Sequence, residues 1–132
     1  MANINKKFIN TEQTVLSSAN RAAPLSQAVV INDLVFCSGI IPQTPEGDLV
    51  EGDIQVKTRQ IISNLKDVLS AAGTSLEKLV KVNVYLKDMG NFSSMNEAYN
   101  ELLPEPKPAR TCVQVANLPR NVDIEIECVA HL

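Results

Sequence analysis

The stretch Val80-Lys81-Val82-Asn83-Val84-Tyr85-Leu86-Lys87 decides the fold class, because apolar and polar residues alternate along it. Alternation with a period of two predicts a β-strand with one face on a core and one wetter face. A helical pattern lies on each side of this strand, at residues 53–73 and 92–103. The sequence therefore predicts a strand between two helices, within a fold that mixes both kinds of element.

The first helical pattern has clear ends. Asp53 carries a side-chain oxygen able to cap the first turn, and Gly73 provides the stop. The second helix begins near Phe92 and is ended by Pro104 and Pro106. Between Asp53 and Gly73, residues at steps of three or four form one buried stripe: Ile54, Thr58, Ile61, Leu65, Val68 and Ala72.

Two strands are predicted before the first helix, at residues 28–31 and 34–38, joined by a tight turn at Asn32-Asp33. Two more follow the second helix, at residues 109–116 and 122–132. The start of the chain reads as irregular, and a third early strand is expected without a defined range. The resulting order, β-β-β-α-β-α-β-β, does not alternate strictly, which favours an α+β fold over a doubly wound parallel one.

Length, composition and charge limit the classes of function. The 132 residues are 45% hydrophobic and 20% charged, which predicts one domain covering residues 1–132. The apolar runs are far shorter than the ~20 residues of a membrane span, so we expect no membrane partner. The net charge of -3, with lysine and arginine spread along the chain, argues against nucleic acid as a partner.

Cysteine and histidine usage argues against a metal site. The three cysteines lack C-x-x-C spacing, and the chain has 1 histidine. We therefore expect reduced thiols and no metal, and the lack of nucleotide and cofactor motifs predicts no cofactor. The start of the chain lacks the apolar core of a secretory signal. The expected location is the cytoplasm, with the mitochondrial matrix as the alternative.

Arg110 is the first candidate for chemistry, at the start of a strand directly after Pro108-Ala109. Its parity differs from that of Thr111 and of the valines two and four residues further on, which are the expected core-facing set. The pattern thus predicts that Arg110 points away from the core. A guanidinium held there can bind a carboxylate through two parallel hydrogen bonds. The alternative is a surface arginine that pairs with Glu125 or Glu127.

Glu125 and Glu127 share one face of the last strand and are flanked by isoleucines. A half-apolar recess there raises carboxylate basicity and suits an acid that orients or deprotonates water, and the alternative is a solvated strand face. Cys112 shares the parity of Arg110, but no histidine or lysine close in sequence would lower its pKa. The Ser38-Gly39 pair follows an apolar strand, where it either lines a pocket or makes a simple turn.

The run Pro108-Ala109-Arg110-Thr111-Cys112-Val113-Gln114-Val115-Ala116-Asn117-Leu118-Pro119, followed by Val122-Asp123-Ile124-Glu125-Ile126-Glu127, closely resembles the signature of the RidA/YjgF family of reactive intermediate deaminases. Supporting matches are Ser38-Gly39 with Pro42, and Asn96 with Tyr99 on the second helix. The resemblance implies a chorismate-mutase-like α+β subunit, a mixed β-sheet with two helices packed on one face. It also implies a homotrimer with its sites between subunits.

The resemblance further implies the roles of individual residues. Arg110 matches the arginine that binds the substrate carboxylate, and Glu125 matches the glutamate that positions a hydrolytic water together with the backbone at Cys112. Ser38, Gly39 and Asn96 match pocket-lining positions. The implied activity is hydrolysis of 2-aminoacrylate-type enamine and imine acids to 2-keto acids and ammonia, without a metal or organic cofactor.

Two residues depart from the family pattern. Leu25 stands where the best-known bacterial members have tyrosine, and Ile40 replaces the glutamine of their S-G-Q sequence. Leu25 cannot donate a hydrogen bond, so a slower, differently selective or lost activity is expected if the tyrosine assists catalysis. Both changes make the expected cleft more apolar. The alternatives are an endoribonuclease or translation inhibitor, and a non-enzymatic protein that binds small carboxylates or protects other proteins.

Overall fold

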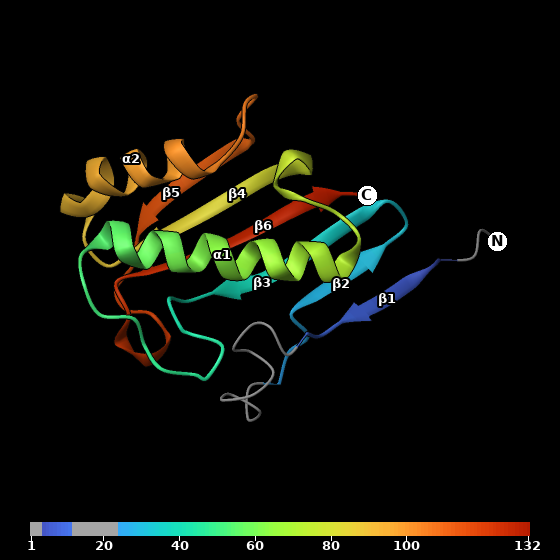
Figure 1. Cartoon of the computed structure of the whole chain (residues 1–132), viewed down its shortest axis with the longest axis horizontal. Helices are drawn as coiled ribbons and strands as arrows, with labels where there is room; N and C mark the ends of the chain where they lie inside the picture. The colour runs from blue at the N-terminus through green and yellow to red at the C-terminus, as the bar shows by residue number, and fades with distance from the viewer. Residues whose placement is uncertain (1–3, 12–23) are drawn as a thin grey trace.

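Six strands form one mixed sheet in the order β1-β2-β3-β6-β4-β5, and two helices cover one of its faces (Figure 1). The structure is a computed structural model that describes residues 4–11 and 24–132. It confirms the expected α+β class and element order. The bounds are β1 Lys6–Ile9, β2 Ala28–Ile31, β3 Leu34–Ile40, α1 Ile54–Ala72, β4 Leu79–Leu86, α2 Phe92–Leu102, β5 Ala109–Gln114 and β6 Ile124–His131.

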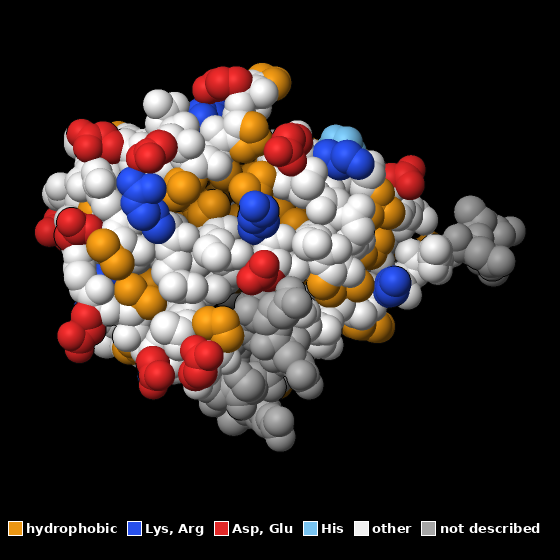
Figure 2. Space-filling model, in the orientation of Figure 1, with side chains coloured by type: hydrophobic (Ala, Val, Ile, Leu, Met, Phe, Trp, Pro, Cys, Tyr) orange, Lys and Arg blue, Asp and Glu red, His pale blue; other side chains and the backbone are white. Residues whose placement is uncertain are grey.

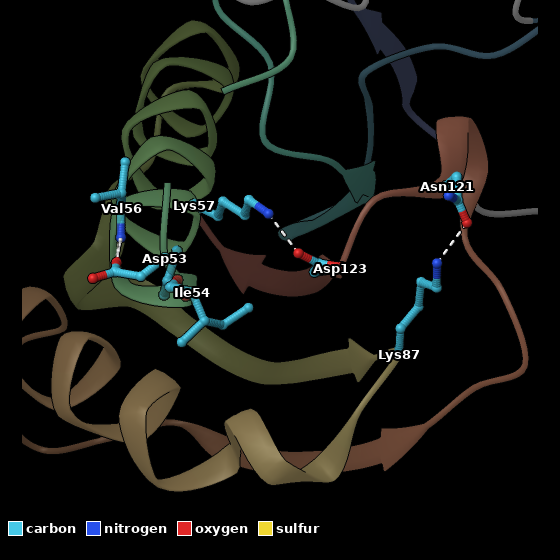
Figure 3. A network of polar contacts seen from close by, with 8 residues as sticks. Asp53, Ile54, Val56, Lys57, Lys87, Asn121 and Asp123 are labelled. Carbon is cyan, nitrogen blue, oxygen red and sulfur yellow. Dashed lines mark hydrogen bonds and ion pairs between the residues drawn. The ribbon is translucent and has the colours of Figure 1, made fainter. Parts of the chain in front are cut away.

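The two helices begin and end for local reasons. The Asp53 carboxylate accepts a hydrogen bond from the backbone N–H of Val56 at 2.9 Å, which caps α1 (Figure 3). Gly73 ends α1 with a φ of 87°, in the left-handed region that favours glycine. The helix α2 connects β4 to β5, which are parallel neighbours and need such a crossover. Within the described residues, no helix is long and apolar enough to span a membrane.

The core lies between the helices and the sheet. On β6, alternate side chains are buried against the helices, while Glu125 and Glu127 point to the opposite face. No helix of the described residues covers that opposite face, which we call the open face (Figure 1). The main core residues of α1 and β6 are Ile61, Leu65, Val68, Leu69, Ile124, Ile126, Cys128 and Ala130.

The third early strand is β1, in the segment that the sequence pattern presents as irregular. It has only four residues, and it pairs antiparallel with β2, with Phe8 opposite Val29. Two lysines and a short apolar end carry no periodicity of their own. This strand is fixed by pairing with β2, a non-local interaction that a local pattern does not report.

Candidate functional site

Arg110 lies on the helix-covered face of the sheet, so the prediction that it points away from the core is wrong. On β5, Arg110 and Cys112 are half-buried, whereas Thr111 and Val113 are exposed. The parallel register places Arg110 beside Val82 of β4, whose side chain belongs to the core. The parity was inverted because β5 is an edge strand whose apolar valine faces the open side of the sheet.

The Arg110 guanidinium is held by side chains of α2. Its carbon Cζ lies 4.7 Å from the ring centroid of Tyr99 and 5.6 Å from that of Phe92. Nη1 is 4.0 Å from the Met95 sulfur. Among the described residues, no carboxylate pairs with Arg110, which also removes the alternative of a surface pair with Glu125 or Glu127. The guanidinium therefore keeps an uncompensated positive charge.

The helix α2 also carries two buried polar atoms without a hydrogen-bond partner in the described parts of the chain, Oδ1 of Asn96 and the hydroxyl of Tyr99. Burial raises the pKa of Tyr99 to about 12 against the opposing charge of Arg110, so the hydroxyl stays protonated at neutral pH. Burial also raises the pKa of the Cys112 thiol, again opposed by Arg110. Cys112 thus lacks the thiolate character of a nucleophile.

Glu125 forms a second group of site residues, on the open face. Its carboxylate lies against Gly39 of β3, where an added Cβ would be 2.2 Å from Oε1. The register of β3 shifts between Cys37 and Ile40, which marks a bulge at this point. The backbone N–H of Ser38 donates to the Gln27 carbonyl at 2.9 Å, and its hydroxyl donates to the Ser26 carbonyl at 2.7 Å. The structure therefore brings Gly39 and Glu125 together, with Ser38 next to Gly39 in β3.

Glu125 and Glu127 have different environments on this face. Glu127 accepts hydrogen bonds from the Tyr85 hydroxyl at 2.6 Å and from Nδ2 of Asn83 at 3.1 Å. The bond to Glu127 raises the pKa of Tyr85 to about 12. Burial, followed by the charge of Glu127, raises the pKa of Glu125, and no described residue donates a hydrogen bond to the Glu125 carboxylate. Glu125 is thus a carboxylate without a hydrogen-bond donor among the described residues, and its pKa is raised by burial.

One chain does not bring Arg110 and Glu125 together. The strand β4 lies between β5 and β6, and the two side chains are on opposite faces of the sheet. Arg110 and Glu125 therefore belong to two separate groups of residues within one chain. Ile40 lies in the core with 3% exposure, whereas Leu25 is exposed.

Two cavities of the described chain are lined by neither Arg110 nor Glu125. One, of about 290 Å³, lies at the surface between α1 and α2, where Figure 2 shows exposed hydrophobic side chains. The other, of about 260 Å³, is walled by the ion pair of Lys57 with Asp123, near the bond from Lys87 to Asn121 (Figure 3). Neither is lined by Arg110. The described residues contain no cluster of three or more side chains able to hold a metal.

The chain as a whole is similar to known proteins. The family described as "Endoribonuclease L-PSP" matches residues 16–132. This chain belongs to that family, the RidA/YjgF family. "Protein mmf1, mitochondrial" of Schizosaccharomyces pombe is 48% identical over 112 residues, which cover 83% of this chain and 68% of the relative.

The names of other RidA/YjgF relatives include a reaction or a ligand. "Reactive Intermediate Deaminase A, chloroplastic" of Arabidopsis thaliana is 37% identical over 132 residues, covering 99% of this chain and 68% of the relative. The crystal structure of TdcF from E. coli with bound serine has a TM-score of 0.87 and 34% identity, and covers 96% of this chain and 98% of that chain. The family thus includes deaminases and a protein that binds an amino acid.

Proposed function

We propose that this RidA/YjgF protein hydrolyses 2-aminoacrylate-type enamine and imine acids to 2-keto acids and ammonia. The observation that carries the proposal is the Arg110 guanidinium, which no carboxylate of the described residues neutralises. Such a group binds a substrate carboxylate through two parallel hydrogen bonds. The serine bound to TdcF, itself a small amino acid, supports a ligand of this size and charge.

In the proposed reaction, Arg110 fixes the carboxylate while the enamine takes its imine form. Glu125 accepts a proton from water, and the water oxygen bonds to the imine carbon as the C=N double bond becomes a C–N single bond. That proton passes to nitrogen, which gives the carbinolamine. The proton of its hydroxyl group then moves to nitrogen while the C–O single bond becomes C=O and the C–N bond breaks, which releases ammonia and leaves the keto acid. Its raised pKa makes Glu125 a better base than an exposed glutamate. Positioning of substrate and water is the main catalytic contribution.

The complete site requires more than one chain. Because Arg110 and Glu125 lie on opposite faces of one sheet, they meet only if neighbouring subunits each supply one of them. The open face is suited to association, since large apolar side chains remain exposed on it: Phe8, Leu34, Phe36 and Val113. We propose the homotrimer that the family resemblance implies, with its sites between subunits.

The remaining proposed site residues surround these two groups. Ser38 and Gly39 line the Glu125 side, and Asn96 and the backbone N–H of Cys112 line the Arg110 side. Leu25 is exposed and directly precedes Ser26. It presents apolar surface where the best-known bacterial members have the hydroxyl of a tyrosine. Ile40 lies in the core and adds no exposed surface. We therefore expect a preference for substrates with a larger apolar side chain over 2-aminoacrylate itself.

The direct test generates 2-aminoacrylate with a serine or cysteine lyase and follows keto-acid release with and without this protein. We expect acceleration by the wild-type chain and its loss in Arg110→Ala. The matched control is Arg59→Ala, since Arg59 is a surface arginine that pairs with Glu101 at 2.8 Å. The comparison of wild type with Leu25→Tyr measures the cost of the departure from the family pattern. If the wild-type chain does not accelerate keto-acid release, the deaminase proposal is wrong.

A second candidate function is RNA cleavage, which the description "Endoribonuclease L-PSP" favours. The net charge of -3 opposes tight RNA binding. Salt-sensitive cleavage that Arg110→Ala abolishes supports this candidate, whereas carboxylate binding without turnover supports a non-enzymatic binding protein. The expected location is the cytoplasm with the mitochondrial matrix as the alternative, and the name of the S. pombe relative supports a mitochondrial location.

A further inference from the structure

Three side chains of α2 contact the guanidinium of Arg110. The Tyr99 ring centroid is 4.7 Å from Cζ, the Phe92 centroid is 5.6 Å away, and the Met95 sulfur is 4.0 Å from Nη1. All three come from one helix, while β5 supplies Arg110 alone. The orientation of the charged group therefore depends on how α2 packs on the sheet.

These contacts hold the cation without neutralising it. A guanidinium over an aromatic face is attracted by the electrons of the ring, and its N–H donors lie in its own plane, away from that face. A carboxylate partner would also fix the guanidinium, but it would occupy the same donors that a substrate carboxylate needs. Contact with the rings thus holds the cation, while its N–H donors, apart from the one that Nη1 directs at the Met95 sulfur, meet no carboxylate of the described residues.

We propose that Tyr99, supported by Phe92, is a positioning residue that holds Arg110 by ring stacking and thereby raises affinity for the substrate carboxylate. The inference rests on the proposed role of Arg110 as the carboxylate anchor. The ring of Tyr99 acts rather than its hydroxyl, because that hydroxyl is buried and has no hydrogen-bond partner among the described residues. Phenylalanine is therefore the conservative replacement, and leucine removes the interaction.

The kinetic test compares Tyr99→Phe, Tyr99→Leu and Phe92→Leu. We expect Tyr99→Leu to raise KM about five- to tenfold with little change in kcat, and Phe92→Leu to raise it less because its ring is farther from the cation. Tyr99→Phe keeps KM within about twofold of wild type. Val68→Ala, a fully buried position on α1, is the control for lost stability and leaves KM unchanged.

A second measurement does not depend on turnover. The Arg110 side-chain protons lie near the Tyr99 ring, so we expect upfield-shifted NMR signals that persist in Tyr99→Phe and return toward ordinary positions in Tyr99→Leu. If Tyr99→Leu does not fold, Phe92→Leu carries both tests. Pyruvate binding, followed by calorimetry, replaces KM if the wild type shows no turnover. Unchanged affinity together with unmoved Arg110 signals overturns the inference, whereas missing turnover alone overturns only the deaminase proposal.

Discussion

The carboxylate of Glu125 occupies the space that a side chain at position 39 would need, since a Cβ on Gly39 would lie 2.2 Å from Oε1. Glycine is required there for close approach and not for an unusual backbone angle. The bulge in β3 thus makes room for the Glu125 side chain of β6. This contact links a turn-like sequence signal, Ser38-Gly39, to the acid that we propose as the catalytic base.

The first prediction concerns this contact. Gly39→Ala should lower the melting temperature in the wild-type background and displace the Glu125 carboxylate, with at least about a tenfold loss of activity. In a Glu125→Ala background the clash is absent, so the same change should cost little stability. Thermal unfolding of the four proteins measures this coupling. Equal destabilisation by Gly39→Ala in both backgrounds would contradict the geometry.

The second prediction concerns pH. Because the pKa of Glu125 is raised above its ordinary value of 4.5, the folded chain keeps this proton to a higher pH than the unfolded chain. The contribution of the protonated Glu125 to stability is therefore lost as pH rises from 4.5 through the raised pKa of Glu125 in the folded chain. The melting temperature of wild type should fall relative to Glu125→Gln over this interval. A parallel pH dependence of the two proteins counts against a raised pKa.

The raised pKa of Glu125 also predicts where activity falls at the acid side of the pH–rate profile. A base must be ionised, so activity should fall as pH decreases through the raised pKa of Glu125 rather than near 4.5. Initial rates of keto-acid release, corrected for the lyase that supplies the substrate, give this limb. An acid limb centred at the ordinary glutamate value would assign the base to another group.

The third prediction separates charge from geometry at Arg110. Arg110→Lys keeps the positive charge but loses the planar fork and its stacking on Tyr99, so KM should rise by about tenfold or more. Arg59→Lys, on the exposed face of α1, should leave KM unchanged. Substrate titration of both variants provides the measurement. A lysine that restores wild-type KM would show that a point charge is sufficient.

The fourth prediction ranks the three cysteines by reactivity. Cys112 is half-buried, whereas Cys37 and Cys128 are buried opposite each other on β3 and β6. In native protein, iodoacetamide should therefore modify Cys112 first, and more slowly than a free thiol because burial raises its pKa. Mass spectrometry of a labelling time course tests the order. Early modification of Cys37 or Cys128 would contradict the packing of this core.

The sequence predicts the elements of this fold better than it predicts their faces. The alternation in β4 and the caps at Asp53 and Gly73 are local signals, and the structure confirms them. The predicted orientation of Arg110 is wrong because valines on an edge strand show the same alternation whether a helix or another subunit covers them. Only the position of β5 at the sheet edge, which results from the crossover through α2, resolves this choice.

The candidate site likewise depends on contacts between elements that the local sequence does not predict. The contact of Gly39 with Glu125 depends on pairing of β3 with β6, and the contacts of Arg110 depend on packing of α2, so neither follows from spacing along the sequence. In the sequence, Tyr99 is distinguished only by the family resemblance. Its stacking on Arg110 required the positions of both elements.

The most direct test of the account mixes two inactive variants. Arg110→Ala and Glu125→Gln chains are unfolded, combined in equal amounts, refolded together, and assayed with lyase-generated 2-aminoacrylate. If neighbouring subunits each supply one residue, random assembly should restore activity at about a quarter of the sites, while each variant refolded alone stays inactive. A mixture as inactive as its components, although the wild type refolds with full activity, would contradict a shared site built from Arg110 and Glu125.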